Sequence, residues 1–144
     1  MASRESTSGP AALDLERTER ALVILIAVHS LVVGLFLVAA PEWGARFGGF
    51  GAVTPLFFAR QAGVFHFVAA TAYLVEYFRY QGVLLLVITK SVAVVFLLMT
   101  SVQDSVPWVV PLSGLADGVM GLAVVFLRRA RGRGLAGPCA RGAE

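Results

Sequence analysis

The chain has 144 residues, of which 58% are hydrophobic and only 15% are charged, with a formal net charge of +3. Its mean hydropathy is +0.79. Ordinary globular domains carry about 25% charged residues, and a soluble chain this small could not bury so much apolar surface. The composition therefore excludes an ordinary soluble domain and favours a protein embedded in a membrane.

The first apolar block runs from Ala21 to Ala40 and contains no Asp, Glu, Lys or Arg. Twenty residues of helix span about 30 Å, the thickness of a bilayer core. Residues 1–13 are polar and rich in small side chains, which predicts a disordered tail. LDLERTER follows and is predicted to prolong the first helix, with Asp14 as its cap. The block is longer than the apolar part of a signal peptide, so we expect it to be retained.

The stretch PEWGARFGGFGAV follows the first block. It is predicted to lie in the membrane interface, anchored by Trp43, Phe47 and Phe50, because aromatic side chains favour that zone.

Three further apolar blocks cover about 56–78, 82–102 and 107–127, and Pro107 suits the first turn of a helix. The links between them, RYQG and QDSV, are so short that neighbouring helices must be antiparallel. The predicted fold is all-α: a polytopic membrane protein with four transmembrane helices in an up-down-up-down bundle. We expect this domain to cover 14–128 and to be followed by a basic tail, 129–144.

The arginines predict the orientation of the bundle. In the predicted topology most of them fall on the side that holds both termini, and the opposite side carries only Arg46 and Arg60. Because cytoplasmic segments are enriched in Lys and Arg, both termini are predicted to be cytoplasmic. Trp43 and Trp108 would then lie at the outer interface.

The third block contains a lysine, Lys90, in the apolar run VITKSVAVV. It lies about 12 Å from the cytoplasmic edge, and Asp117 of the fourth block lies about 15 Å from the same edge. A lone charge at this depth costs about 2.5 to 3.5 kcal/mol or more. We therefore predict that Lys90 and Asp117 form an ion pair inside the bundle.

Small residues indicate which helix faces are buried. Gly114, Gly118 and Gly121 lie on one side of the fourth helix together with Asp117, a pattern typical of close helix packing and, less often, of a homodimer face. In the second helix His66 shares a face with Tyr73 and with several small residues, including Gly63. This face is therefore also expected to point inward.

His29 does not share the small face of the first helix and is expected to lean towards lipid or a neighbour's edge. Its depth is nevertheless close to that of His66, Lys90 and Asp117, so each helix contributes one ionisable group to a band about 6 Å thick. We name this the polar band; with Tyr73 it is the candidate site. Three interpretations stay open: a structural band, a pathway for protons or a small solute, and a haem- or quinone-binding module with His29 and His66 as axial ligands.

Sequence motifs for known chemistry are absent. The single cysteine, Cys139, provides neither a disulfide nor a thiolate metal site, and there is no P-loop, HExxH or GxSxG. We therefore expect no catalytic residues, no metal and no resident cofactor. The RRARGRG tail is expected to attract anionic lipid headgroups, and it lacks the folded or aromatic platform expected for nucleic-acid binding.

The layout resembles that of small bacterial DoxX-like proteins. The resemblance rests on PEWGARFGGFG after helix one, RQAG near the start of helix two, and polar residues confined to the interior, over 21–128. It implies an inner-membrane protein, in some relatives associated with quinone-linked oxidoreductases. Lys90 and Asp117 are not motif residues of that group. The leading prediction is a non-catalytic accessory or scaffold subunit in the lipid bilayer, with a membrane-protein partner or a second copy as its candidate partner.

Overall fold

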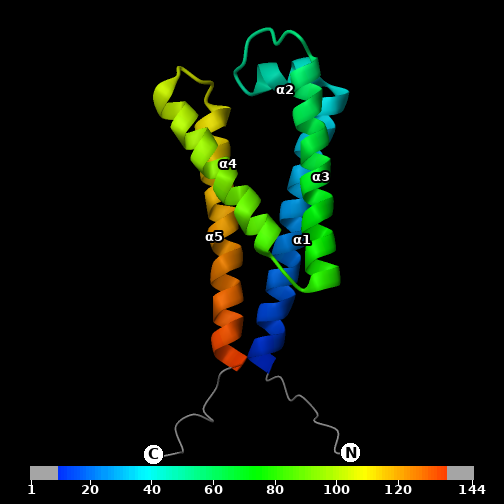
Figure 1. Cartoon of the computed structure of the whole chain (residues 1–144), viewed down its shortest axis with the longest axis vertical. Helices are drawn as coiled ribbons and strands as arrows, with labels where there is room; N and C mark the ends of the chain where they lie inside the picture. Colours follow the sequence, from blue (N-terminus) through cyan, green and yellow to red (C-terminus); the bar gives the residue numbers. More distant parts are fainter. Residues whose placement is uncertain (1–9, 136–144) are drawn as a thin grey trace, which may run out of the picture.

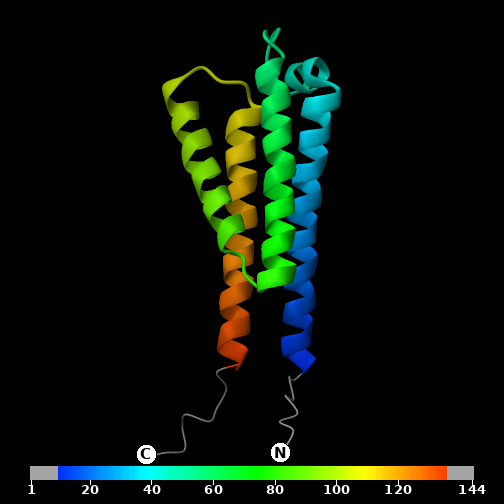
Figure 2. The same cartoon turned by 45° about the vertical axis from the view of Figure 1, so that its right-hand side comes forward.

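A computed structural model of the chain describes residues 10–135. It is all-α, with five helices in the order α1 (Pro10–Ala39), α2 (Pro41–Phe47), α3 (Phe57–Tyr80), α4 (Leu84–Gln103) and α5 (Val109–Leu135). The four long helices lie along the long axis of the molecule and alternate in direction, whereas the short α2 caps one end (Figures 1 and 2). We call this the α2 end. The opposite end, where α1 starts and α5 finishes, is the terminal end.

Three helices are long and apolar enough to cross a membrane: α1 over Leu13–Ala39, α4 over Leu84–Gln103, and α5 over Val109–Arg133. Helix α3 is not one of them, because Arg60, His66 and Glu76 interrupt its apolar residues. The predicted all-α class is confirmed, and three of the four predicted spans coincide with helices that could cross a membrane. The fourth span stays a prediction.

The helix boundaries differ from the predicted ones at several points. Helix α1 already begins at Pro10, so Asp14 is not its cap; the Asp14 carbonyl instead accepts a hydrogen bond from Thr18 within the helix. Pro107 precedes α5 rather than occupying its first turn. Helix α5 continues to Leu135 and includes part of the predicted basic tail. Residues 1–9 and 136–144, the rest of the two predicted tails, lie outside the described residues.

The helices form two tightly packed pairs, α1 with α3 and α4 with α5, and α1 also packs against α5. The pairs are visible in both views (Figures 1 and 2). The core is built where all four long helices meet, and its fully or nearly fully buried members are Val23, Ile26, Tyr73, Tyr77, Leu86 and Val124. The outside is also strongly apolar: Leu25, Phe65 and Leu122 are among many large side chains that are more than 60% exposed. Such an exterior suits lipid and not water.

Candidate functional site

The predicted ion pair of the polar band is formed. Lys90 Nζ on α4 donates a hydrogen bond to Asp117 Oδ1 on α5, and the two side chains are only 8% and 17% exposed. Gly121 of α5 lies opposite the stem of the lysine, because a Cβ at this glycine would lie 3.5 Å from Lys90 Cβ, an ordinary van der Waals distance. The pair therefore joins two helices that are already neighbours in sequence and space.

The glycines of α5 face α4. A Cβ added at Gly114 would lie 3.2 Å from Leu97, and one at Gly118 would lie 3.6 Å from Val94. With Gly121 opposite Lys90, all three glycines predicted to pack against a helix do so within the same chain. Gly63 of α3 is more crowded than these three glycines, because a Cβ added there would lie 2.7 Å from the backbone oxygen of Gly34 on α1.

The two histidines occupy different environments. His66 is half-buried, and its Nδ1 lies 2.8 Å from the Ala62 carbonyl oxygen one turn earlier. This is the local hydrogen bond that commonly satisfies an imidazole inside a helical protein. His29 is exposed, as its separation from the small residues of α1 predicted, and it remains close enough to Lys90 and Asp117 to interact with their charges. Its neighbour Ser30 is instead buried, at 3% exposure.

Tyr73 connects the polar band to α3. The residue is 3% exposed and belongs to the buried cluster that also contains Leu86 of α4 and Val124 of α5. Tyr73 therefore packs against the two helices that carry the Lys90–Asp117 pair.

The buried part of the polar band is internally satisfied. No buried side-chain nitrogen or oxygen in the described part of the chain lacks a hydrogen-bond partner. The described residues also contain no group of three or more His, Cys, Asp or Glu that could hold a metal ion. Because a reactive site needs an accessible or unsatisfied group, this arrangement is typical of a packing element.

A second charged cluster, which the sequence analysis missed, lies at the terminal end. Glu19 of α1 is completely buried, and its Oε1 accepts a 2.7 Å hydrogen bond from Arg128 Nη1 of α5. Its Oε2 lies 3.4 Å from Arg131, which also lies 3.7 Å from Glu16. Arg128 additionally donates to the Gln81 carbonyl oxygen in the α3–α4 turn. We call Glu16, Glu19, Arg128 and Arg131 the terminal-end ion cluster.

The spacing of residues in α1 contained a signal for this cluster. Glu19, Val23, Ile26 and Ser30 recur at intervals of three and four residues, and all four are buried. Since such residues share one face of a helix, Glu19 continues the inward-facing stripe of the apolar block. A carboxylate on such a stripe needs a cationic partner from a neighbouring helix.

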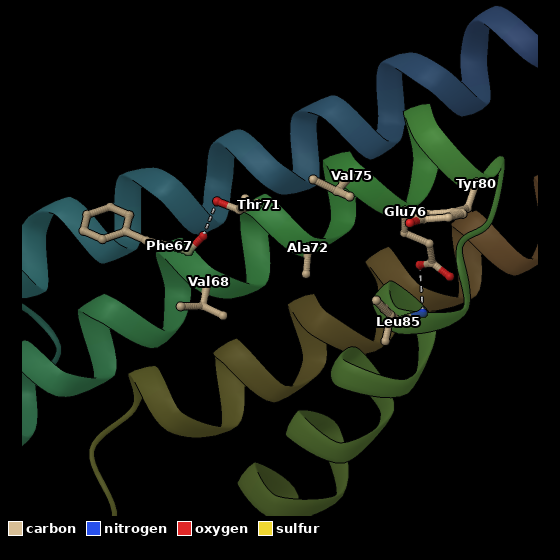
Figure 3. A pocket seen from close by; sticks show the side chains of 8 residues that line it. All are labelled: Phe67, Val68, Thr71, Ala72, Val75, Glu76, Tyr80 and Leu85. Atoms are coloured by element: carbon tan, nitrogen blue, oxygen red, sulfur yellow. Dashed lines mark hydrogen bonds between the residues drawn. The ribbon is translucent and has the colours of Figure 1, made fainter.

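Glu76, near the end of α3, has a structural role. Its two carboxylate oxygens accept hydrogen bonds of 2.8 Å from the backbone N–H groups of Leu84 and Leu85. Figure 3 shows the carboxylate reaching across the turn to Leu85. The side chain therefore caps the first turn of α4, whose preceding residue Val83 provides no side-chain cap.

An apolar groove of 710 Å³ opens beside this cap. Its lining residues, drawn in Figure 3, come from α3 except for Leu85 of α4: Phe67, Val68, Thr71, Ala72, Val75, Glu76, Tyr80 and Leu85. The Thr71 hydroxyl is already used, since it donates to the Phe67 carbonyl oxygen at 2.8 Å. The polar band residues do not line the groove.

Comparisons with known proteins identify no relative: no family, no curated protein and no solved structure matches the chain. The resemblance to DoxX-like proteins therefore stays a prediction.

Proposed function

We propose that this protein is a non-catalytic integral membrane protein, a small accessory or scaffold subunit with four transmembrane helices. The closed Lys90–Asp117 pair is the observation that carries the proposal. Two charges that are mutually satisfied, shielded from lipid and away from the apolar groove fix the register of α4 on α5.

Helix α3 is the fourth span in this proposal. Its 24 residues reach about 36 Å, enough to cross a bilayer. Its buried positions Gly63, Ala70 and Tyr73 face the other helices, and its outward residues Phe65, Val68 and Val75 are apolar and at least half exposed. Arg60 and Arg79 lie near its ends, where long side chains extend to the headgroups.

The proposed location is a bacterial inner membrane, as the resemblance to DoxX-like proteins implies, with both termini cytoplasmic. The support for this orientation is the distribution of arginines: Arg17, Arg20, Arg79 and the arginines of the last turns of α5 lie towards the terminal end, and Arg46 and Arg60 lie towards the α2 end. The basic residues of the terminal end would then meet anionic lipid headgroups of the inner leaflet.

Cysteine labelling tests the topology and the status of α3 together. In a Cys139→Ser background, a cysteine is placed at Gly51, between α2 and α3, or at Tyr80, which is 75% exposed at the end of α3. A membrane-impermeant maleimide should label Gly51→Cys in intact cells and Tyr80→Cys only after lysis. Labelling of both positions from the same side would show that α3 does not cross the membrane and would end the four-span proposal.

Proton flux tests the scaffold role against a conducting pathway. Purified protein in liposomes that contain a pH-sensitive dye should give the same proton leak as empty liposomes. Liposomes that contain the Lys90→Met, Asp117→Leu double variant should show the same proton leak as the wild-type and the empty liposomes. A leak through the wild type that the double variant loses would assign a transport role to the polar band and overturn the scaffold proposal.

A further inference from the structure

The two arginines of the α2 end converge on one pocket. Arg46 belongs to the short α2 and Arg60 to the start of α3, and both line a cavity of 310 Å³ together with Glu42 and Trp43. Among the described residues they are the basic residues of that end of the molecule. They stand apart from the other arginines of the described residues, which gather towards the terminal end.

The charges of this pocket are poorly compensated within the chain. Arg46 lies 3.5 Å from Glu42, but the two side chains are 73% and 64% exposed, so this pair contributes little. No hydrogen bond or ion pair of the Arg60 guanidinium occurs within residues 10–135. Arg60 also lies close to the positive end of the α3 dipole, where a cation is unfavourable.

We propose that this pocket, lined by Arg46, Arg60 and Trp43, binds a phosphate group, and that its ligand is a phosphodiester. Guanidinium groups bind phosphate oxygens through paired N–H donors, and Trp43 lines the same pocket. Two arginines and one glutamate carry a net charge of +1, which a phosphodiester with one negative charge neutralises.

The surroundings favour a phospholipid headgroup as the source of that phosphate. Trp43 stacks on Phe47 at 5.4 Å and lies 5.3 Å from Phe36, which forms an aromatic cluster beside the pocket. Tryptophan concentrates at the level of the headgroups in membrane proteins. The lipid source depends on the membrane placement proposed above, whereas phosphate binding itself does not.

Two binding measurements on the full-length protein in detergent distinguish the sources. In the first, inorganic phosphate is titrated against chloride at equal ionic strength while thermal stability is recorded. In the second, native mass spectrometry counts bound phosphatidylglycerol and a galactolipid with the same acyl chains but no phosphate. Binding in both measurements, or in the second alone, supports a lipid headgroup, and binding of inorganic phosphate alone supports a soluble phosphate compound.

Matched variants test whether the phosphate group binds at this pocket. Arg60→Gln and Arg46→Gln should each weaken the phosphate-dependent signal about tenfold, the usual consequence of losing one hydrogen-bonded charge. Arg60→Lys should restore part of it, and Gln61→Ala, at an exposed position that does not line the pocket, should change nothing. Because Arg46 and Arg60 are exposed, the variants should melt at the wild-type temperature without phosphate. The proposal is overturned if neither probe binds wild type, or if Gln61→Ala reduces binding as much as Arg60→Gln.

Discussion

Glu19 and Arg128 are separated by almost the whole transmembrane part of the chain, yet Glu19 Oε1 lies 2.7 Å from Arg128 Nη1 and the glutamate is completely buried. The contact joins the first and last helices at the end where both termini leave the fold. Because α1 and α5 belong to different helix pairs, it is one of the few polar contacts that hold the pairs together.

Glu19→Gln should destabilise the fold by about 1 to 3 kcal/mol, because it leaves Arg128 and Arg131 without their buried counter-charge. The lower part of this range allows for the partial exposure of both arginines. Thermal melting in detergent measures the change. The matched control is Glu16→Gln, whose 3.7 Å pair involves a half-exposed carboxylate and should be worth well under 1 kcal/mol. Equal losses in the two variants would show that the burial of Glu19 has no energetic consequence.

Single substitutions of Lys90 or Asp117 should cost more than the double substitution. Lys90→Met or Asp117→Leu alone leaves one unpaired charge in a nearly buried site, which is worth about 3 to 5 kcal/mol, whereas replacing both partners is close to neutral. A double-mutant cycle, followed by thermal melting, gives the coupling energy. Additive losses would mean that the two charges are stabilised independently.

Gly63→Ala should destabilise the packing of α1 on α3 by about 1 to 3 kcal/mol. The new Cβ would lie 2.7 Å from the Gly34 backbone oxygen and 2.8 Å from Val38, and a backbone atom cannot move aside as the end of a side chain can. Gly132→Ala is the control, because nothing lies within 4 Å of its added Cβ, and the better helix propensity of alanine should make it neutral or stabilising. A well-tolerated Gly63→Ala would contradict the close crossing of the two helices.

Glu76→Ala should cost about 1 to 2 kcal/mol, because two backbone N–H groups of α4 lose their hydrogen-bond acceptor. Hydrogen exchange should localise the loss to the first turn of α4. Glu42→Ala provides the comparison, since that carboxylate is exposed and caps no helix by a hydrogen bond. Unchanged exchange at Leu84 and Leu85 would show that water replaces the cap without cost.

The all-α class and the positions of three apolar helices followed from the sequence alone. Apolar runs of about 20 residues have one stable form in lipid, because a helix satisfies its own backbone hydrogen bonds. The Lys90–Asp117 pair was also predictable. The helical rise places both residues at one depth, and an unpaired charge at that depth is energetically unfavourable. The inward direction of Gly63 and Tyr73 followed from helical periodicity.

Tertiary structure decided which helices pack together and which partners Glu19, Glu76 and the arginines of the α2 end find. Nothing in the sequence pattern of α1 indicates whether Glu19 faces α3, α4 or α5, because periodicity defines a face and not its neighbour. The role of Glu76 depends on a turn that returns α4 to the end of α3, and the convergence of Arg46 and Arg60 depends on how α2 folds against the start of α3. Local chemistry therefore determined the helices and their buried faces. The ion cluster, the cap and the pocket depend instead on how those faces pair, and this pairing is decided by packing between residues far apart in the sequence.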